Sequence, residues 1–133
     1  MRLWHKDLIQ GLPREQLVSQ WRECSAIAKS IKTKGTPNHI LVNKVMDYPI
    51  DHFISYSYYV RQEMTKRGYK TMQYVMDGII ELKPDYKLLP IDQLFINWHT
   101  NIYMKVCYWN LYEKYDCGGI EEKAWEEILK YAK

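Results

Sequence analysis

Glu23 is the side chain whose surroundings in the sequence best suit proton chemistry. It follows Arg22 directly and shares its segment with Arg14 and Lys29. A carboxylate beside these cations weakens the binding of an anionic partner, so a glutamate here indicates a role in proton or charge chemistry. The alternative interpretation is an ordinary solvated glutamate on an exposed helix flank.

Other kinds of reactive site are poorly supported by the spacing of candidate residues. The four histidines form no pair with metal-ligand spacing, and the chain has no phosphate-binding glycine motif. His99 fits either an acid–base group or a hydrogen-bonded structural histidine. The cysteines show no CxxC spacing. We therefore expect no metal and no cofactor. The residues considered are His5, His39, His52, His99, Cys24, Cys107 and Cys117.

The charge of the chain is concentrated near its start. Residues 1–50 hold eight lysines and arginines against four acidic residues, which favours an anionic partner for this part. The composition includes 12 tyrosines and five tryptophans, side chains that suit half-buried positions, interfaces and base stacking. No apolar run has membrane-spanning length, and the odd cysteine count argues against a disulfide framework, so we expect a cytoplasmic, reduced protein with no membrane partner.

Helical periodicity dominates the whole chain, and no convincing strand pattern accompanies it. The sequence predicts an all-α fold, a compact bundle of about five to six helices forming one domain over residues 1–133. Thr36 is expected to cap the second helix, Asp51 the third, and a stripe from Phe95 to Trp109 is expected to face inward. The predicted helices span residues 13–31, 36–45, 51–67, 71–82, 91–116 and 121–132.

The first long helix places its functional candidates on two flanks. Apolar residues from Leu17 to Ile31 form one stripe at helical spacing. Glu23 lies on one side of this stripe, beside Gln16 and Gln20, and Arg22 lies on the other side. Uncharged amides next to a carboxylate are consistent with the lining of a groove.

Three motifs, in order along the chain, resemble those of the phage-type pyrimidine-dimer DNA glycosylases with lyase activity. The segment LPREQLVSQWRE, Leu12 to Glu23, is similar to the first helix of that family and carries its catalytic glutamate. Thr36-Pro37-x-x-Ile40-Leu41 followed by Val45 resembles a second family segment. Glu63-x-x-Lys66-Arg67-Gly68-Tyr69 resembles a third, so the resemblance spans roughly residues 1–70.

The resemblance implies a specific mechanism. Enzymes of this family attack the C1′ atom of the damaged nucleotide with the α-amine of the chain, form an imine and cut the strand by β-elimination. α-Amines have a pKa of about 7.7–8.0, low enough to be partly nucleophilic at cellular pH. Arg2 is too bulky for removal of the initiator, so Met1 is expected to supply the amine, with Glu23 assisting sugar opening and proton transfer.

The partner implied is damaged double-stranded DNA, bound by a monomer. The residues expected to contact DNA are Arg2, His5, Arg14, Gln16, Arg22, Lys29 and Lys44. Two departures from the family pattern favour abasic-site cleavage over dimer specificity: Met1 stands where the family has threonine, and Ala26 replaces a basic residue. Two alternatives stay open, a non-catalytic nucleic-acid-binding helical module and a helical protein-interaction domain.

Overall fold

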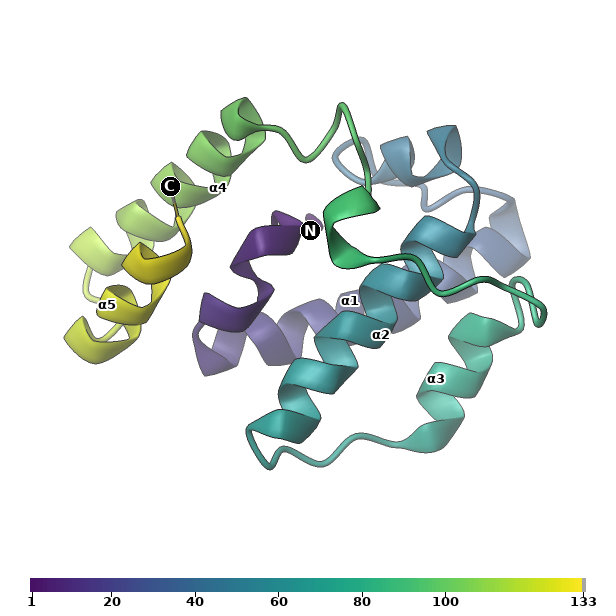
Figure 1. Cartoon of the computed structure of the whole chain (residues 1–133), viewed down its shortest axis with the longest axis horizontal. Helices are drawn as coiled ribbons and strands as arrows, with labels where there is room; N and C mark the ends of the chain where they lie inside the picture. Colours follow the sequence, from purple (N-terminus) through teal and green to yellow (C-terminus); the bar gives the residue numbers. More distant parts are fainter. Residues whose placement is uncertain (133) are drawn as a thin grey trace.

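The computed structural model describes residues 1–132. It confirms the all-α prediction, since the described residues form α-helices and short 3-10 helices without a strand (Figure 1). The elements in chain order are η1 (Lys6–Gly11), α1 (Arg14–Lys34), η2 (Asn43–Asp47), α2 (Asp51–Lys66), α3 (Gln73–Ile80), η3 (Ile91–Gln93), α4 (Asn101–Asp116) and α5 (Glu122–Tyr131). No helix of residues 1–132 is long and apolar enough to cross a membrane.

The N-terminal segment runs through the middle of the molecule, between α4 and the α1–α2 pair (Figure 1). Leu3 is fully buried, and its carbonyl accepts a 2.7 Å hydrogen bond from the Tyr103 hydroxyl of α4. The Trp4 carbonyl accepts a 2.6 Å bond from the hydroxyl of Tyr56 on α2. Two helices distant in sequence therefore fix the first residues of the chain.

Helix α1 begins and ends close to the predicted boundaries. Pro13 precedes it, and its last turn is closed by Gly35, whose φ of 75° lets its N–H reach the Ile31 carbonyl. The predicted apolar stripe is buried, as Leu17 and Cys24 show. Burial of this stripe against α2 and α3 explains why the 3.6-residue period predicted the helix correctly.

The predicted helix over residues 36–45 is wrong. Thr36 caps no helix, and only Asn43–Asp47 forms a single 3-10 segment. Local side-chain bonds replace helical ones here: the Asn43 Oδ1 accepts from the His39 N–H at 3.0 Å, and the Thr36 carbonyl accepts from Ser30 Oγ at 2.8 Å. Short polar side chains that bond nearby backbone groups compete with helix formation in this way.

The predicted long helix over residues 91–116 is also wrong. Phe95 and Asn97 have φ values of 51° and 76°, and α4 begins only at Asn101, after a Thr100 cap. The buried Lys6 ammonium donates to the carbonyls of Asp92 and Leu94 at 2.9 and 2.7 Å. These carbonyls are therefore bonded to a side chain instead of to later turns of a helix.

This break changes which face of α4 is buried. Met104, Cys107 and Leu111 lie inside, whereas the predicted inward residues Ile102, Val106 and Trp109 are exposed. Residues with left-handed backbone conformation change the direction of the chain. The helical spacing of apolar residues before such a break therefore does not predict which face is buried after it. Helix α4 therefore carries an exposed apolar stripe along its outer face.

Asp51 does not cap α2 as predicted. It is the first helical residue, and its carboxylate accepts 2.9 Å and 2.7 Å bonds from the Lys83 ammonium and the Lys87 backbone N–H. The two bonds lower the pKa of Asp51. The aspartate therefore holds the loop after α3 against the start of α2.

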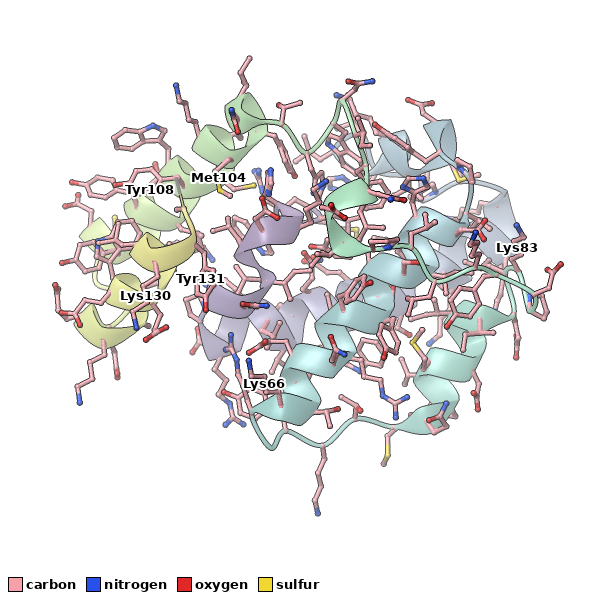
Figure 2. The ribbon with its side chains drawn as sticks, in the orientation of Figure 1. Lys66, Lys83, Met104, Tyr108, Lys130 and Tyr131 are labelled. Carbon is pink, nitrogen blue, oxygen red and sulfur yellow. The ribbon has the colours of Figure 1, made fainter. Side chains whose placement is uncertain are left out.

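Helix α5, close to the predicted 121–132, packs mainly on η1. Tyr131 lies between the two elements (Figure 2), and Gly11 of η1 meets its ring so closely that a Cβ there would sit 2.6 Å from Cδ2. Trp125 and Ile128 are also buried, and the Trp125 ring packs on Tyr108, Tyr112 and Tyr115 of α4. The last helix of the chain therefore supports the segment that carries the first residues.

Candidate active site at the N-terminus

Gln20 is the centre of the hydrogen-bond network that joins the first residues of the chain to α1. Its carboxamide is fully buried. Its Oε1 accepts from the Trp4 N–H at 2.7 Å and from the Tyr56 hydroxyl at 2.9 Å. Its Nε2 donates to the Arg2 carbonyl at 2.9 Å and to Glu23 Oε2 at 3.1 Å. The amide thus satisfies all its hydrogen-bonding capacity and fixes Glu23 beside the chain terminus.

Glu23 is half-buried, and the charge of the α-amino group of Met1 acts on its carboxyl. Burial raises the pKa of Glu23, while the α-amino charge and a hydrogen bond from the Arg2 backbone act in the opposite direction. His39 influences the pKa of Glu23 in the same direction as the α-amino group, so the loop after α1 lies near the carboxyl. A carboxyl with a raised pKa keeps its proton to higher pH than a solvent-exposed glutamate does.

A groove of about 470 Å³ contains Arg2, the residue after Met1, whereas neither Met1 nor Glu23 is among its lining residues. Arg2 and Lys44 supply its cations, and the Arg2 guanidinium lies 5.3 Å from the centroid of the Trp4 ring. Ile40, Leu41 and the first turns of α4 also line it. Arg2 therefore links this groove to the chain terminus.

A family model for pyrimidine dimer DNA glycosylases matches residues 1–77, more than half of the chain. The chain belongs to this family. The match contains Met1, Glu23 and Lys44 and ends before α4. A search of curated proteins and a search of solved structures found no match.

The family has DNA as its substrate, and the residues expected to contact DNA are found in several places. Arg2 and Lys44 share the groove, and Arg22 is exposed on α1, next to Glu23. Lys29 is exposed along the same helix, in a hollow that it shares with α3. Arg14 lies at the other end of α1, with its guanidinium 4.7 Å from the Tyr69 ring centroid.

Two of these expectations are corrected by burial. His5 is 4% exposed and Gln16 is 7% exposed, so neither side chain offers a surface to DNA. His5 caps η1 by accepting from the Asp7 N–H, and burial lowers its pKa. The glycosylase-family chain therefore uses these residues for packing of the N-terminal segment and of α1.

Sequence reasoning missed the contributions of Tyr56, Tyr103 and His39 to the site. Tyr56 was expected only on the core stripe of its helix and Tyr103 only in a polar cluster, whereas the hydroxyl of each donates to one carbonyl of the N-terminal segment. His39 was visible inside the motif Thr36-Pro37-x-x-Ile40-Leu41, at an unassigned position. Its position between Pro37 and Ile40, two residues that match the family motif, could have identified His39 from the sequence.

His99 has the structural role that the sequence offered as one of two alternatives. Its Nδ1 accepts from the Lys6 N–H at 2.9 Å, and burial lowers its pKa to about 2. Its ring lies among those of Phe95, Trp98 and Tyr103, with centroids 4.8 to 5.0 Å away. An imidazole that stays neutral to such low pH cannot exchange protons in the physiological range.

The thiols on the buried side of the site are poor nucleophiles. Cys24 is completely buried, and burial raises its pKa to about 12. Burial also raises the pKa of Cys107. Within residues 1–132, no group of three histidine, cysteine or acidic side chains is arranged to hold a metal ion. The α-amino group and Glu23 interact through charge, and a reactive site at the terminus therefore has these two groups as its candidates.

Proposed function

We propose that this protein is a DNA glycosylase with abasic-site lyase activity, in which the α-amine of Met1 is the nucleophile. The observation that carries the proposal is the position of Glu23, which is half-buried and feels the charge of the α-amino group. An amine needs an adjacent acid–base group to become an effective nucleophile toward a sugar carbon. Membership of the glycosylase family supplies the substrate, damaged DNA.

The proposed reaction begins at C1′ of the damaged nucleotide. The nitrogen lone pair of Met1 attacks C1′ while the protonated Glu23 carboxyl donates to the ring oxygen, so the C1′–O4′ bond breaks. Loss of the base, or of water at a site already abasic, leaves an imine. Removal of a C2′ proton then shifts electrons into the imine system, and the 3′ phosphate leaves with its bonding pair. The raised pKa of Glu23 supports the first proton transfer.

The proposed DNA interface follows the basic side chains around the terminus. Arg2 and Lys44 line the groove, and Arg22 and Lys29 extend the positive charge along α1. Arginine and lysine contacts to phosphates fix the register of a protein on a duplex. Arg14 would reach phosphates farther from the lesion, because it lies about 13 Å along α1 from Glu23 at about 1.5 Å per residue.

Borohydride trapping on a duplex with one abasic site tests the mechanism. Wild-type protein is expected to form a covalent adduct, and acetylation or extension of the N-terminus is expected to abolish it. Glu23→Gln is expected to slow trapping by about 10² to 10⁴-fold while leaving DNA binding intact. Glu15→Gln, at an exposed position of the same helix, is the matched control.

The same experiment discriminates between the remaining alternatives. Salt-dependent duplex binding without any adduct would contradict the proposed chemistry and leave a non-catalytic nucleic-acid-binding module. An adduct that persists after the terminus is blocked would exclude Met1 as the nucleophile. Absence of both binding and adduct would leave a helical protein-interaction domain.

A further inference from the structure

Ile40 has the largest exposed fraction among the large apolar side chains of residues 1–132, at 85%. It does not stand alone. Leu41 beside it and Ile102 across the groove, on α4, are 48% and 75% exposed. Isolated exposed apolar residues are ordinary, but a cluster at the edge of a basic groove indicates a surface that is covered in a complex.

The loop that presents Ile40 is held rigidly. The Leu41 N–H donates to His39 Nδ1 at 3.2 Å, and the Val42 and Asn43 N–H groups donate to the His39 carbonyl at 3.0 and 2.9 Å. Asn38 has a φ of 57°, in the left-handed region, which turns the chain outward just before these residues. Pro37 is buried below. The exposed side chain is thus displayed on a fixed support.

This loop adjoins the proposed reaction centre. His39, the residue before Ile40, lies close enough to Glu23 to influence its pKa, and Ile40 lines the groove together with Arg2, the residue after Met1. The cations Arg2 and Lys44 favour a polyanion as the occupant of this groove. An exposed apolar side chain that lines a groove together with two cations suits a partner with phosphates outside and apolar stacked bases inside.

We propose that Ile40 is a wedge that enters the base stack next to the lesion when the protein binds damaged duplex DNA, supported by Leu41. The proposal rests on the proposed function for its partner, DNA. Apolar side chains inserted between base steps unstack and kink the duplex, and so bring a sugar within reach of groups that an intact helix would exclude. The wedge would hold the distorted duplex open while C1′ approaches the Met1 amine.

Fluorescence of 2-aminopurine tests this proposal without requiring catalysis. The probe is a duplex with a non-cleavable tetrahydrofuran abasic analogue and 2-aminopurine as the neighbouring base in the same strand. Wild-type protein is expected to raise the fluorescence on binding, because the probe base loses its stacking partner. Ile40→Ala is expected to reduce this rise to about one third or less, and Ile40→Leu to preserve most of it.

Met72→Ala is the matched control, because Met72 is a 61% exposed apolar residue just before α3, outside the groove. Both positions are solvent-exposed, so both variants are expected to keep the wild-type melting temperature. Ile40→Ala is also expected to slow trapping on a fully paired duplex by about tenfold, and by less than about twofold at an abasic site in an unpaired bulge.

Failure of the wedge and failure of the proposed chemistry give different results. Equal fluorescence changes for wild type and Ile40→Ala, or binding by wild type without any change, would overturn the wedge. Absence of trapping by wild type would overturn the Met1 mechanism alone, since the analogue duplex reports unstacking without a reaction. A loss of the signal in Ile40→Ala but not in Met72→Ala supports the wedge in either case.

Discussion

Nε2 of Gln20 lies 3.1 Å from Oε2 of Glu23, and the same nitrogen donates to the Arg2 carbonyl. One buried amide therefore sets the position of the carboxylate and of the chain terminus relative to each other. Its Oε1 is bonded to the Trp4 N–H and the Tyr56 hydroxyl, so the amide cannot rotate without breaking four hydrogen bonds.

Gln20→Leu is expected to destabilise the protein by about 2 to 4 kcal/mol, because it leaves the buried Trp4 N–H and Arg2 carbonyl without their partner. Chemical denaturation measures this loss. Gln62→Leu, at an exposed position of α2, serves as the control and is expected to change the free energy of unfolding by less than about 0.5 kcal/mol. Similar effects of the two substitutions would show that the Gln20 network contributes little.

The raised pKa of Glu23 predicts a pH-dependent effect of Glu23→Gln on stability. The folded protein holds the Glu23 proton to higher pH than the unfolded chain, whose carboxyl titrates at its ordinary value of 4.5. The stabilisation from this group is complete below that value and is lost as pH rises through the folded-state pKa. We therefore expect the stability of Glu23→Gln relative to wild type to increase as the pH rises above the ordinary glutamate value of 4.5.

Denaturation of both proteins at several pH values measures this difference. Glu15→Gln, whose side chain is exposed, is expected to show no such trend. A stability difference that falls with rising pH would mean that the α-amino charge outweighs burial at Glu23.

His99 predicts the acid sensitivity of the fold. The unfolded chain binds a proton at this histidine below about pH 6.5, whereas the folded protein keeps it neutral down to about 2. Stability is therefore expected to fall with decreasing pH by up to about 1.4 kcal/mol per pH unit from this residue. His99→Asn, whose Oδ1 can replace Nδ1 as the acceptor for the Lys6 N–H, should lower stability at neutral pH by about 1 to 3 kcal/mol.

The variant should also flatten the acid limb below pH 6.5, which urea titrations at decreasing pH would reveal. The buried His5 has a lowered pKa as well and keeps part of the slope. Parallel acid limbs for wild type and His99→Asn would contradict the burial of a neutral imidazole at this position.

Two glycines predict opposite effects of the same substitution. An added Cβ at Gly11 would meet Tyr131 Cδ2 at 2.6 Å and the Glu127 carbonyl at 3.2 Å, so Gly11→Ala is expected to cost about 1 to 3 kcal/mol by pushing α5 from η1. Gly78, within α3, has only the flexible end of Lys32 at 3.7 Å. Gly78→Ala is expected to stabilise by about 0.5 to 1 kcal/mol.

Thermal melts of the two variants make this comparison directly. A neutral Gly11→Ala would mean that Tyr131 moves aside without loss of packing. The contrast between the two sites separates the helix propensity of alanine from the close approach of η1 and α5.

The sequence predicted the elements whose stability is local. Helices α1, α2, α3 and α5 have apolar stripes and clear ends, as with Gly35 after α1, and the structure contains each of them close to the expected bounds. Glu23 and Met1 came from motif resemblance, and in the structure the charge of the α-amino group acts on the Glu23 carboxyl. Helices that depend mainly on contacts within one or two of their own turns could therefore be predicted from the sequence.

The segments that sequence reasoning mistook depend on distant partners. The bonds from Lys6 to the carbonyls around residue 93 cross more than 80 positions of the chain, and no local pattern contains them. The roles of Gln20 and His5 changed for the same reason, since both side chains face an N-terminal segment whose path the sequence did not reveal. The exposed stripe on α4 followed from the break at Phe95 and Asn97.

The docking of α5 on η1 has a consequence for biosynthesis. A ribosome releases η1 well before α5, so η1 lacks this support until α5 has emerged. Until then the terminus ahead of η1 would be loosely held, and the proposed nucleophile would lack its orientation. The fold thereby couples the emergence of α5 to the readiness of the proposed nucleophile.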